Sequence, residues 1–107
     1  MIFIEAPTSS KELTKIASEI DAPLVANMIE EGVTPTLSAK ELFRMGYNIA
    51  LFPLSALFAA TFAIMKAFSE LKKTGTTEHA RGMMVTFNEF NKLVDLQKYI
   101  GLENRYA

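Results

Sequence analysis

The chain has 107 residues, which allows one domain at most. Its net charge of −1 gives no electrostatic reason to expect binding to nucleic acid or to an anionic membrane. The absence of cysteine excludes disulfides, thiolate metal sites and cysteine catalysis. The hydrophobic fraction of 50% is high for so short a chain, which suggests that some apolar surface is meant for a partner.

The first repeat begins with an apolar run over residues 1–4, which predicts a strand that ends at Glu5. No basic start precedes this run, so no signal peptide is expected and the predicted compartment is the cytoplasm. After the breaker Pro7, Ser9 and Glu12 have the spacing of a capping box, in which each side chain satisfies the other residue's backbone N–H. The sequence therefore predicts a strand followed by a helix.

The second repeat has the same order. Residues 23–26 are apolar and predict a strand that ends at Asn27. A polar loop over residues 30–35 follows, and Ser38 with Glu41 forms a second capping box. This box predicts a short helix that ends at Gly46.

The third repeat lies within residues 46–73, and three interpretations compete for it. One is a transmembrane helix, since residues 45–65 carry no charge and about 20 apolar residues span a bilayer. The others are one long core helix, or a buried strand over residues 48–52 that turns into a buried helix. Pro53 favours the last, because proline costs about 3 kcal/mol inside a helix but fits its first turn. The helical pattern also continues past Lys66, where a membrane span would have ended.

The remaining residues predict a helical tail. Residues 78–81 have the composition of one more helical turn, and Thr86 with Glu89 makes a third capping box that opens a helix to about residue 94. Residues 96–100 predict a short further helix with Gly101 as its stop. Such an apolar tail often packs on a neighbouring subunit, which makes a homo-oligomer an expected state.

Alternating apolar strands and helices predict an α/β fold with a parallel sheet. The (β/α)8 TIM barrel is built from such units and takes about 250 residues for all eight. Three units are present, and the chain starts directly on a buried-type strand. We therefore expect residues 1–75 to be the last three βα units of a partial barrel, and residues 76–107 to be its C-terminal helical tail.

Ligands of parallel α/β folds bind at the carboxyl ends of strands, which singles out Glu5, Asn27 and the turn that contains Leu54 and Ser55. Glu5 could act as a general acid or base or as a hydrogen-bond acceptor, or it could be a solvated loop carboxylate. Asn27 could donate to a carboxylate, or it could be a turn residue. Ser55 could add a donor to an anion site at the helix N-terminus, or it could be an N-cap.

Other motifs are sparse. His79 is the only histidine and lies in a flexible stretch, so we interpret it as exposed. Glu30 and Glu31 could bind a cation or form a solvated loop pair. No glycine-rich phosphate loop and no Ser/His/Asp set can be assembled from these residues.

Several short motifs follow one another in a familiar order: IEAP at residues 4–7, PLVANM at 23–28, GVTP at 32–35, FPLSAL at 52–57, and the tail from 84 to 106. On these motifs the chain resembles the isocitrate lyase / phosphoenolpyruvate mutase superfamily, and 2-methylisocitrate lyases in particular, over nearly its whole length. The resemblance would make the three strands the sixth, seventh and eighth of a barrel.

The resemblance implies Mg²⁺-dependent cleavage or formation of C–C or C–P bonds in 2-hydroxy or 2-oxo dicarboxylates. Glu5 would match the family's strand-end glutamate near the substrate. Asn27 would match the asparagine that binds a substrate carboxylate, with Met28 and Ile29 alongside. In 2-methylisocitrate lyases arginines usually occupy the places of Phe58 and Phe87, so a smaller or less charged substrate, such as a dimethylmalate- or oxaloacetate-like acid, is favoured.

The family's metal-binding aspartates and catalytic loop belong to the first five strands, so no catalytic or metal-binding residue is assigned here. We therefore expect the C-terminal part of a lyase, inactive alone, that needs a complementing N-terminal barrel segment and a small dicarboxylate substrate. The alternatives are a self-associating assembly module without catalysis, part of a carboxyvinyl-carboxyphosphonate or phosphoenolpyruvate phosphonomutase, and, least favoured, a small membrane protein.

Overall fold

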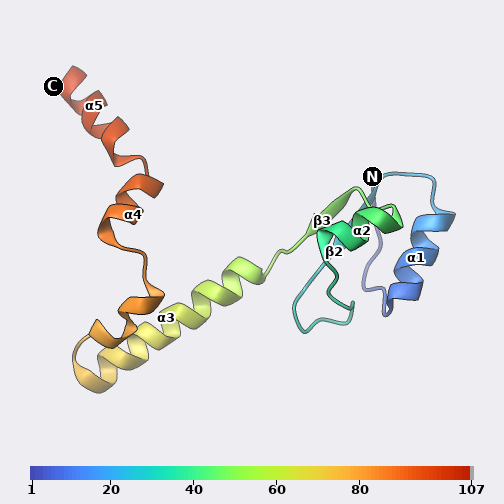
Figure 1. Ribbon diagram of the computed structural model, residues 1–107, viewed down its shortest axis with the longest axis horizontal. Coiled ribbons are helices and arrows are strands. Elements are labelled where there is room, and N and C mark those ends of the chain that lie inside the picture. The colour runs from blue at the N-terminus through green and yellow to red at the C-terminus, as the bar shows by residue number, and fades with distance from the viewer. Residues whose placement is uncertain (107) are drawn as a thin grey trace. The chain divides into compact units, whose positions relative to one another are not determined.

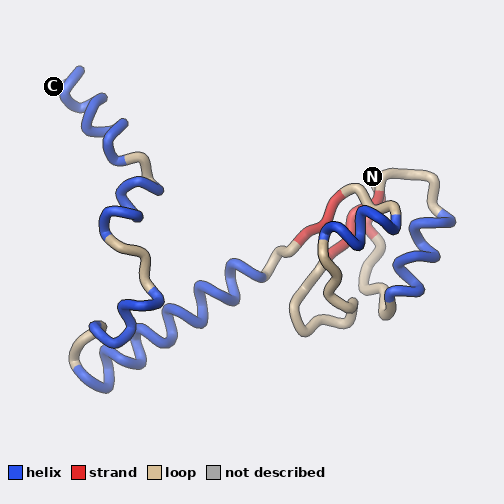
Figure 2. Tube along the Cα trace, viewed as in Figure 1, coloured by secondary structure: helices blue, strands red, loops and turns tan. Residues whose placement is uncertain are grey.

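The computed structural model of the chain describes residues 1–106 (Figure 1). They form two compact units, the first over Met1–Ala60 and the second beginning at Thr61. Helices and strands alternate in the first unit, whereas the second is helical (Figure 2). The elements are β1 Ile2–Phe3, α1 Ser10–Glu19, β2 Leu24–Asn27, α2 Ala39–Met45, β3 Ile49–Leu51, α3 Ser55–Thr74, the 3-10 helix η1 Glu78–Met83, α4 Phe87–Leu93 and α5 Leu96–Tyr106.

The three strands form one parallel sheet in the order β1-β2-β3. Ile2 lies opposite Leu24 in the first pair, and Asn27 lies opposite Leu51 in the second. Parallel neighbours need a crossover connection, and here α1 and α2 supply it. The predicted parallel α/β fold is confirmed, and the carboxyl ends of all three strands meet at one edge of the sheet.

The core of the first unit lies between the central strand and the two crossover helices. Leu13 from α1 and Leu42 from α2 are 1% and 0% exposed, and they share a cluster with Leu24 and Ala26 of β2. Since neighbouring strand residues point to opposite faces, Val25 and Asn27 belong to the other face of the sheet. The helices therefore cover one face of β2.

Capping explains where the helices begin. Ser38 and Glu41 form the complete capping box that was predicted, and Thr86 and Glu89 form another. The first box is only half made, because Ser9 accepts from the Glu12 N–H at 3.2 Å while the Glu12 carboxylate binds the Thr8 N–H at 2.6 Å. Gly46 ends α2 with a φ of 111°, in the left-handed region that favours glycine.

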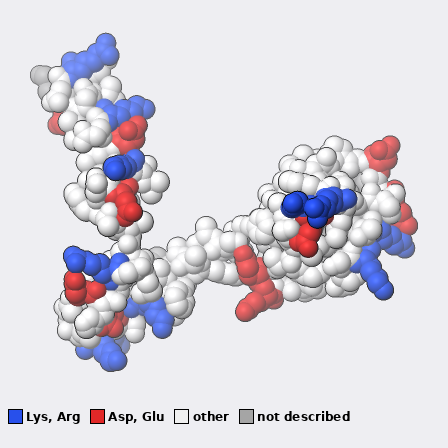
Figure 3. Space-filling model, in the orientation of Figure 1, with Lys and Arg blue, Asp and Glu red and all other residues white. Residues whose placement is uncertain are grey.

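Helix α3 begins two residues after Pro53, as the strand–turn–helix interpretation predicts. The expectation that it is buried is wrong for the described residues, since none of its side chains is fully buried. Phe62 and Met65, for example, are 59% and 67% exposed. The first half of α3 is drawn without blue or red side chains in Figure 3, because Lys66 is the first charged residue of this helix. No helix within residues 1–106 is long and apolar enough to cross a membrane.

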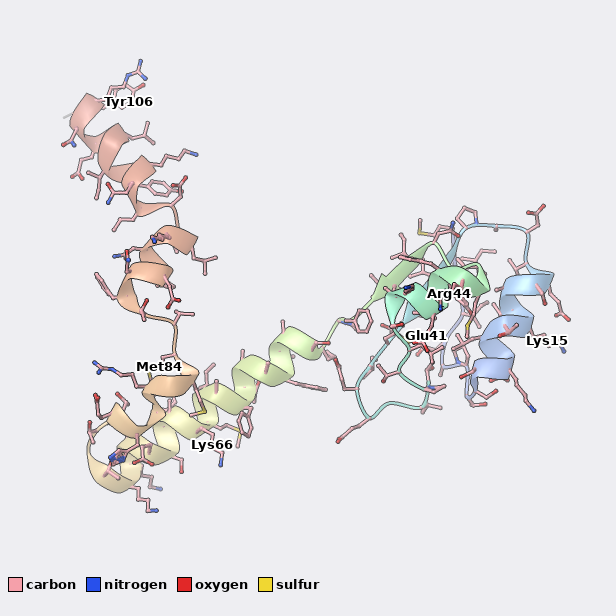
Figure 4. The ribbon with its side chains drawn as sticks, viewed as in Figure 1. Lys15, Glu41, Arg44, Lys66, Met84 and Tyr106 are labelled. Carbon is pink, nitrogen blue, oxygen red and sulfur yellow. The ribbon has the colours of Figure 1, made fainter. Side chains whose placement is uncertain are left out.

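In the second unit η1 packs on α3. Ala80 is 2% exposed, and Met84, labelled in Figure 4, borders a hollow together with Ala63 and Ala67 of α3. The predicted stop at Gly101 is wrong, because α5 continues through it to Tyr106. Glycine inside a helix costs only about 1 kcal/mol relative to alanine, so a helix can continue through it.

The core predicts a large difference between two neighbouring positions of α2. Leu42→Ala should lower the free energy of unfolding by about 2–5 kcal/mol, because it leaves a cavity at a fully buried side chain. Phe43→Ala, at a side chain that is 53% exposed, should change it by less than about 1 kcal/mol. Urea unfolding followed by circular dichroism checks both values, and equal losses would contradict the described core.

Candidate functional site

A cavity of about 260 Å³ lies at the carboxyl edge of the sheet. Its walls come from the residues that follow β1, from the end of β2, and from the loop between β2 and α2. Leu13 of α1 and Tyr47 before β3 complete the lining. The edge that topology singles out is therefore hollow, and it has room for a small ligand.

Four of the six predicted site residues line this cavity. Glu5 and Asn27 bring a carboxylate and an amide to it, and Met28 and Ile29 lie beside them. Glu5 is exposed, Asn27 is half-buried and Met28 is 0% exposed. The structure thus brings together one hydrogen-bond acceptor, one amide that can donate or accept, and two apolar side chains.

The backbone turns sharply between Glu5 and α1. Ala6 has a φ of 49°, in the left-handed region that side chains with a Cβ rarely adopt, and it directly precedes Pro7. Such strain costs of order 1–3 kcal/mol and persists only where surrounding contacts impose it. Here Pro7 is buried, and both residues line the cavity.

Two polar residues of the cavity were not predicted. Thr34 is 8% exposed, and Tyr47 is 4% exposed with its hydroxyl donating to the Leu13 carbonyl oxygen at 3.2 Å. Burial raises the pKa of the Tyr47 phenol, so it is held in its neutral, donating form. The GVTP motif, which contains Thr34, marks the family resemblance, whereas nothing local in the sequence marks Tyr47.

The remaining two predicted site residues, Leu54 and Ser55, are not among the described residues that line this cavity. Ser55, the first residue of α3, donates its hydroxyl to the Glu30 carboxylate. Glu30, Glu31, Ser55 and Phe58 border a second hollow, of about 320 Å³. Glu30 was expected in a cation site or as a solvated loop carboxylate, and its bond to Ser55 was not anticipated.

Ser55 perturbs the chemistry of Glu30. Its hydrogen bond lowers the pKa of the Glu30 carboxyl below the usual 4.5, against a smaller opposing effect of desolvation. The second carboxylate oxygen, Oε2, is buried and has no hydrogen-bond partner within residues 1–106. Glu30 is therefore a half-buried, charged acceptor.

The donor set does not fit a metal ion. No group of three or more His, Cys, Asp or Glu side chains that could hold one occurs within residues 1–106. Glu5 is the single carboxylate among the described residues of the cavity, whereas Mg²⁺ sites use carboxylates in an octahedral set of oxygens. Any metal at this edge would need ligands from another segment.

Comparison with known proteins gives close relatives, although no family model matches the chain. It is 43% identical over 105 residues to the chloroplastic carboxyvinyl-carboxyphosphonate phosphorylmutase of Arabidopsis thaliana, which is 98% of this chain and 31% of that protein. It is 40% identical over 107 residues to 2,3-dimethylmalate lyase of Eubacterium barkeri, covering 100% of this chain and 37% of that protein.

Solved structures agree. A crystal structure of 2,3-dimethylmalate lyase, described as a PEP mutase/isocitrate lyase superfamily member, matches with a TM-score of 0.80 and 28% identity over 98% of this chain and 37% of that one. Oxaloacetate acetylhydrolase shares the fold, with a TM-score of 0.82 at 24% identity over 98% of this chain and 36% of that one.

The fold and the site define a parallel α/β chain with a ligand-sized cavity at the carboxyl edge of its sheet. The chain belongs to the PEP mutase/isocitrate lyase superfamily and matches the C-terminal part of its members, as the sequence motifs predict. It spans about a third of the length of these curated relatives.

The Glu30–Ser55 contact predicts a change in titration. Ser55→Ala should raise the pKa of Glu30 toward or above 4.5, because the carboxylate loses its main hydrogen bond. In the natural chain the contact stabilises the fold above about pH 4.5, and this stabilisation is lost as the pH falls through the lowered folded pKa. Carboxyl ¹³C NMR measures the pKa directly. Ser69→Ala on the same helix is the control, and an unchanged Glu30 pKa in Ser55→Ala would contradict the contact.

Proposed function

We propose that the chain is the substrate-binding C-terminal part of a carbon–carbon lyase that acts on 2-hydroxy or 2-oxo dicarboxylates. The observation that carries this proposal is the gathering of Glu5, Asn27, Met28 and Ile29 in one cavity. The identity of 40% to 2,3-dimethylmalate lyase over the whole chain supports the substrate class.

The roles follow from the chemistry of the side chains. Asn27 would donate its amide N–H to a substrate carboxylate, and Glu5 would accept from the substrate hydroxyl or from water, or exchange a proton with it. Met28 and Ile29 would contact the carbon skeleton. Leu54 and Ser55 remain candidate substrate contacts, although the Ser55 hydroxyl already donates to Glu30.

We further infer that β1, β2 and β3 are the last three strands of a (β/α)8 barrel. Their parallel order, the helices that connect them and the match to the C-terminal third of the relatives support this. In this proposal residues 1–75 are barrel units and residues 76–107 are a tail. The proposal also makes the chain inactive alone, and it assigns Mg²⁺ to ligands on the complementing N-terminal segment.

The substrate is proposed to be smaller or less charged than methylisocitrate, since Phe58 and Phe87 offer no positive charge to a further carboxylate. A phosphonomutase is the alternative enzyme class. The 43% identity to the carboxyvinyl-carboxyphosphonate phosphorylmutase favours it as strongly as the lyase match favours cleavage.

A complementation experiment tests the enzyme proposal. The chain is mixed with the part of the Eubacterium barkeri lyase that precedes the matched region, or fused to it as one polypeptide. Loss of 2,3-dimethylmalate in Mg²⁺ buffer is followed by mass spectrometry. Turnover should require both parts and should stop with EDTA, and Asn27→Ala should lower kcat/KM by about 10–100-fold, because a hydrogen bond to a charged group is worth about 1.5–3 kcal/mol.

Asn88→Ala makes the same chemical change in the tail and serves as the control. The proposal fails if the fused protein folds but consumes no dicarboxylate, or if Asn27→Ala and Asn88→Ala have the same kinetics. Rearrangement of a carboxyphosphonate substrate without cleavage of dimethylmalate would select the mutase alternative.

A second candidate function, self-association without catalysis, is supported by apolar exposure in the second unit. Phe87, Leu93 and Tyr106 are 84%, 78% and 77% exposed. Contiguous exposed apolar patches on soluble proteins often mark interaction surfaces. We propose that this tail contacts a second copy of the chain, so that the protein is a homo-oligomer.

Sedimentation tests this proposal. The full chain should sediment as a concentration-dependent oligomer, and deletion of residues 76–107 should shift it toward the monomer. Phe87→Ser with Leu93→Ser should give the same shift if folding is retained by circular dichroism. A monodisperse monomer of the full chain at every concentration would contradict self-association.

A further inference from the structure

The loop between β2 and α2, residues 28–38, forms one wall of the cavity. Gly32 and Thr34 line it from this loop. Within the loop the Gly32 N–H donates to the Ile29 carbonyl oxygen at 3.1 Å, and the Leu37 N–H donates to the Met28 sulfur at 3.3 Å. Glu31 adopts a φ of 58°, so the chain reverses sharply at this point. These contacts shape the loop but do not tie it to α3.

Glu30 makes the side-chain contact that joins the loop to α3, whereas the Met28 N–H joins the start of the loop to the Leu51 carbonyl oxygen of β3 at 2.8 Å. The Glu30 carboxylate accepts from the hydroxyl of Ser55, which is 25 residues further along the chain and is the first residue of α3. A negative charge is favourable beside a helix N-terminus, where backbone N–H groups are free. The carboxylate nevertheless keeps one buried oxygen without a partner within residues 1–106. Burying an unsatisfied acceptor is unfavourable, so the Ser55 hydrogen bond is needed to keep the Glu30 carboxylate in this position.

The place of Glu30 in the chain links this contact to the cavity. It directly follows Ile29, which lines the cavity, and it lies three residues beyond Asn27 at the end of β2. Movement of Glu30 would therefore displace Ile29, whereas Asn27 stays paired with Leu51 and the Met28 N–H stays bonded to the Leu51 carbonyl oxygen at 2.8 Å. The Glu30–Ser55 bond joins the loop that follows β2 to the helix that follows β3.

We propose that Glu30 is a positioning residue, which through Ser55 holds the 28–38 loop, and with it the cavity wall, against the first turn of α3. This inference rests on the proposed function, because the positioned wall contains Ile29, one of its candidate substrate contacts. Without the bond the loop opens locally while the sheet and its core persist, since neither the sheet hydrogen bonds nor Leu13 and Leu42 depend on it.

Amide hydrogen exchange of the 107-residue chain, followed by NMR without any ligand, tests the proposal. The Gly32 and Leu37 amides report on the loop, and the Asn48 amide, which donates to the Leu24 carbonyl oxygen at 2.9 Å, reports on the sheet. Glu30→Ala and Ser55→Ala should each speed exchange at Gly32 and Leu37 about tenfold, and the double variant should add little more, because all three lose the same bond.

Two further variants separate positioning from a general structural effect. Glu30→Gln keeps an acceptor oxygen and should restore loop exchange to within about twofold of the natural chain. Glu31→Ala truncates the neighbouring, exposed glutamate and should leave exchange unchanged.

Unchanged loop exchange in Glu30→Ala would overturn the proposal. Equal acceleration at Asn48 would also overturn it, because the effect would then be global destabilisation. Natural loop rates in Ser55→Ala would show that Ser55 does not hold the loop. Since no substrate is present, a chain that passes this test but shows no turnover after complementation refutes only the proposed function.

Discussion

The parallel pairing of β2 between β1 and β3 is the constraint on which the rest of the structure depends. It makes Leu24 and Ala26 a surface on which α1 and α2 can bury Leu13 and Leu42. It also brings the carboxyl ends of the strands to one edge, where Glu5 and Asn27 meet at a cavity. Fold and candidate site are thus two consequences of one pairing pattern.

The same pattern leaves apolar surface uncovered. Ile2 and Phe3 of β1 are 37% and 44% exposed, and Leu51 of β3 is 41% exposed. Edge strands present backbone N–H and C=O groups that favour pairing with another chain. The chain spans about a third of the length of its curated relatives, and we propose that the edges of β1 and β3 pair with strands of a complementing segment. This is the physical basis for the proposed complementation.

The sequence predicted what depends on local pattern. Pro53 set the turn before α3, the Ser38–Glu41 box set the start of α2, and the apolar runs that end at Glu5 and Asn27 located the cavity. The sequence did not predict features that depend on residues far apart in the chain. Burial of α3 needs a covering surface that the described residues do not supply, and the bond from Ser55 to Glu30 crosses two elements. The Glu12 carboxylate accepts from the Thr8 N–H instead of the Ser9 N–H. These two backbone donors are adjacent in the chain, so the spacing of the motif does not decide between them.

The most direct test of the account is whether the sheet edges acquire partners. Backbone amide exchange of β1 and β3 is measured with the chain alone and after addition of the N-terminal part of a superfamily lyase. If β1 and β3 pair with strands of that part, outward-facing amides of both edge strands should become protected, while amides already bonded to β2 should change little. Edge amides that exchange equally fast in both samples would contradict the claim that this sheet is one part of a larger parallel structure.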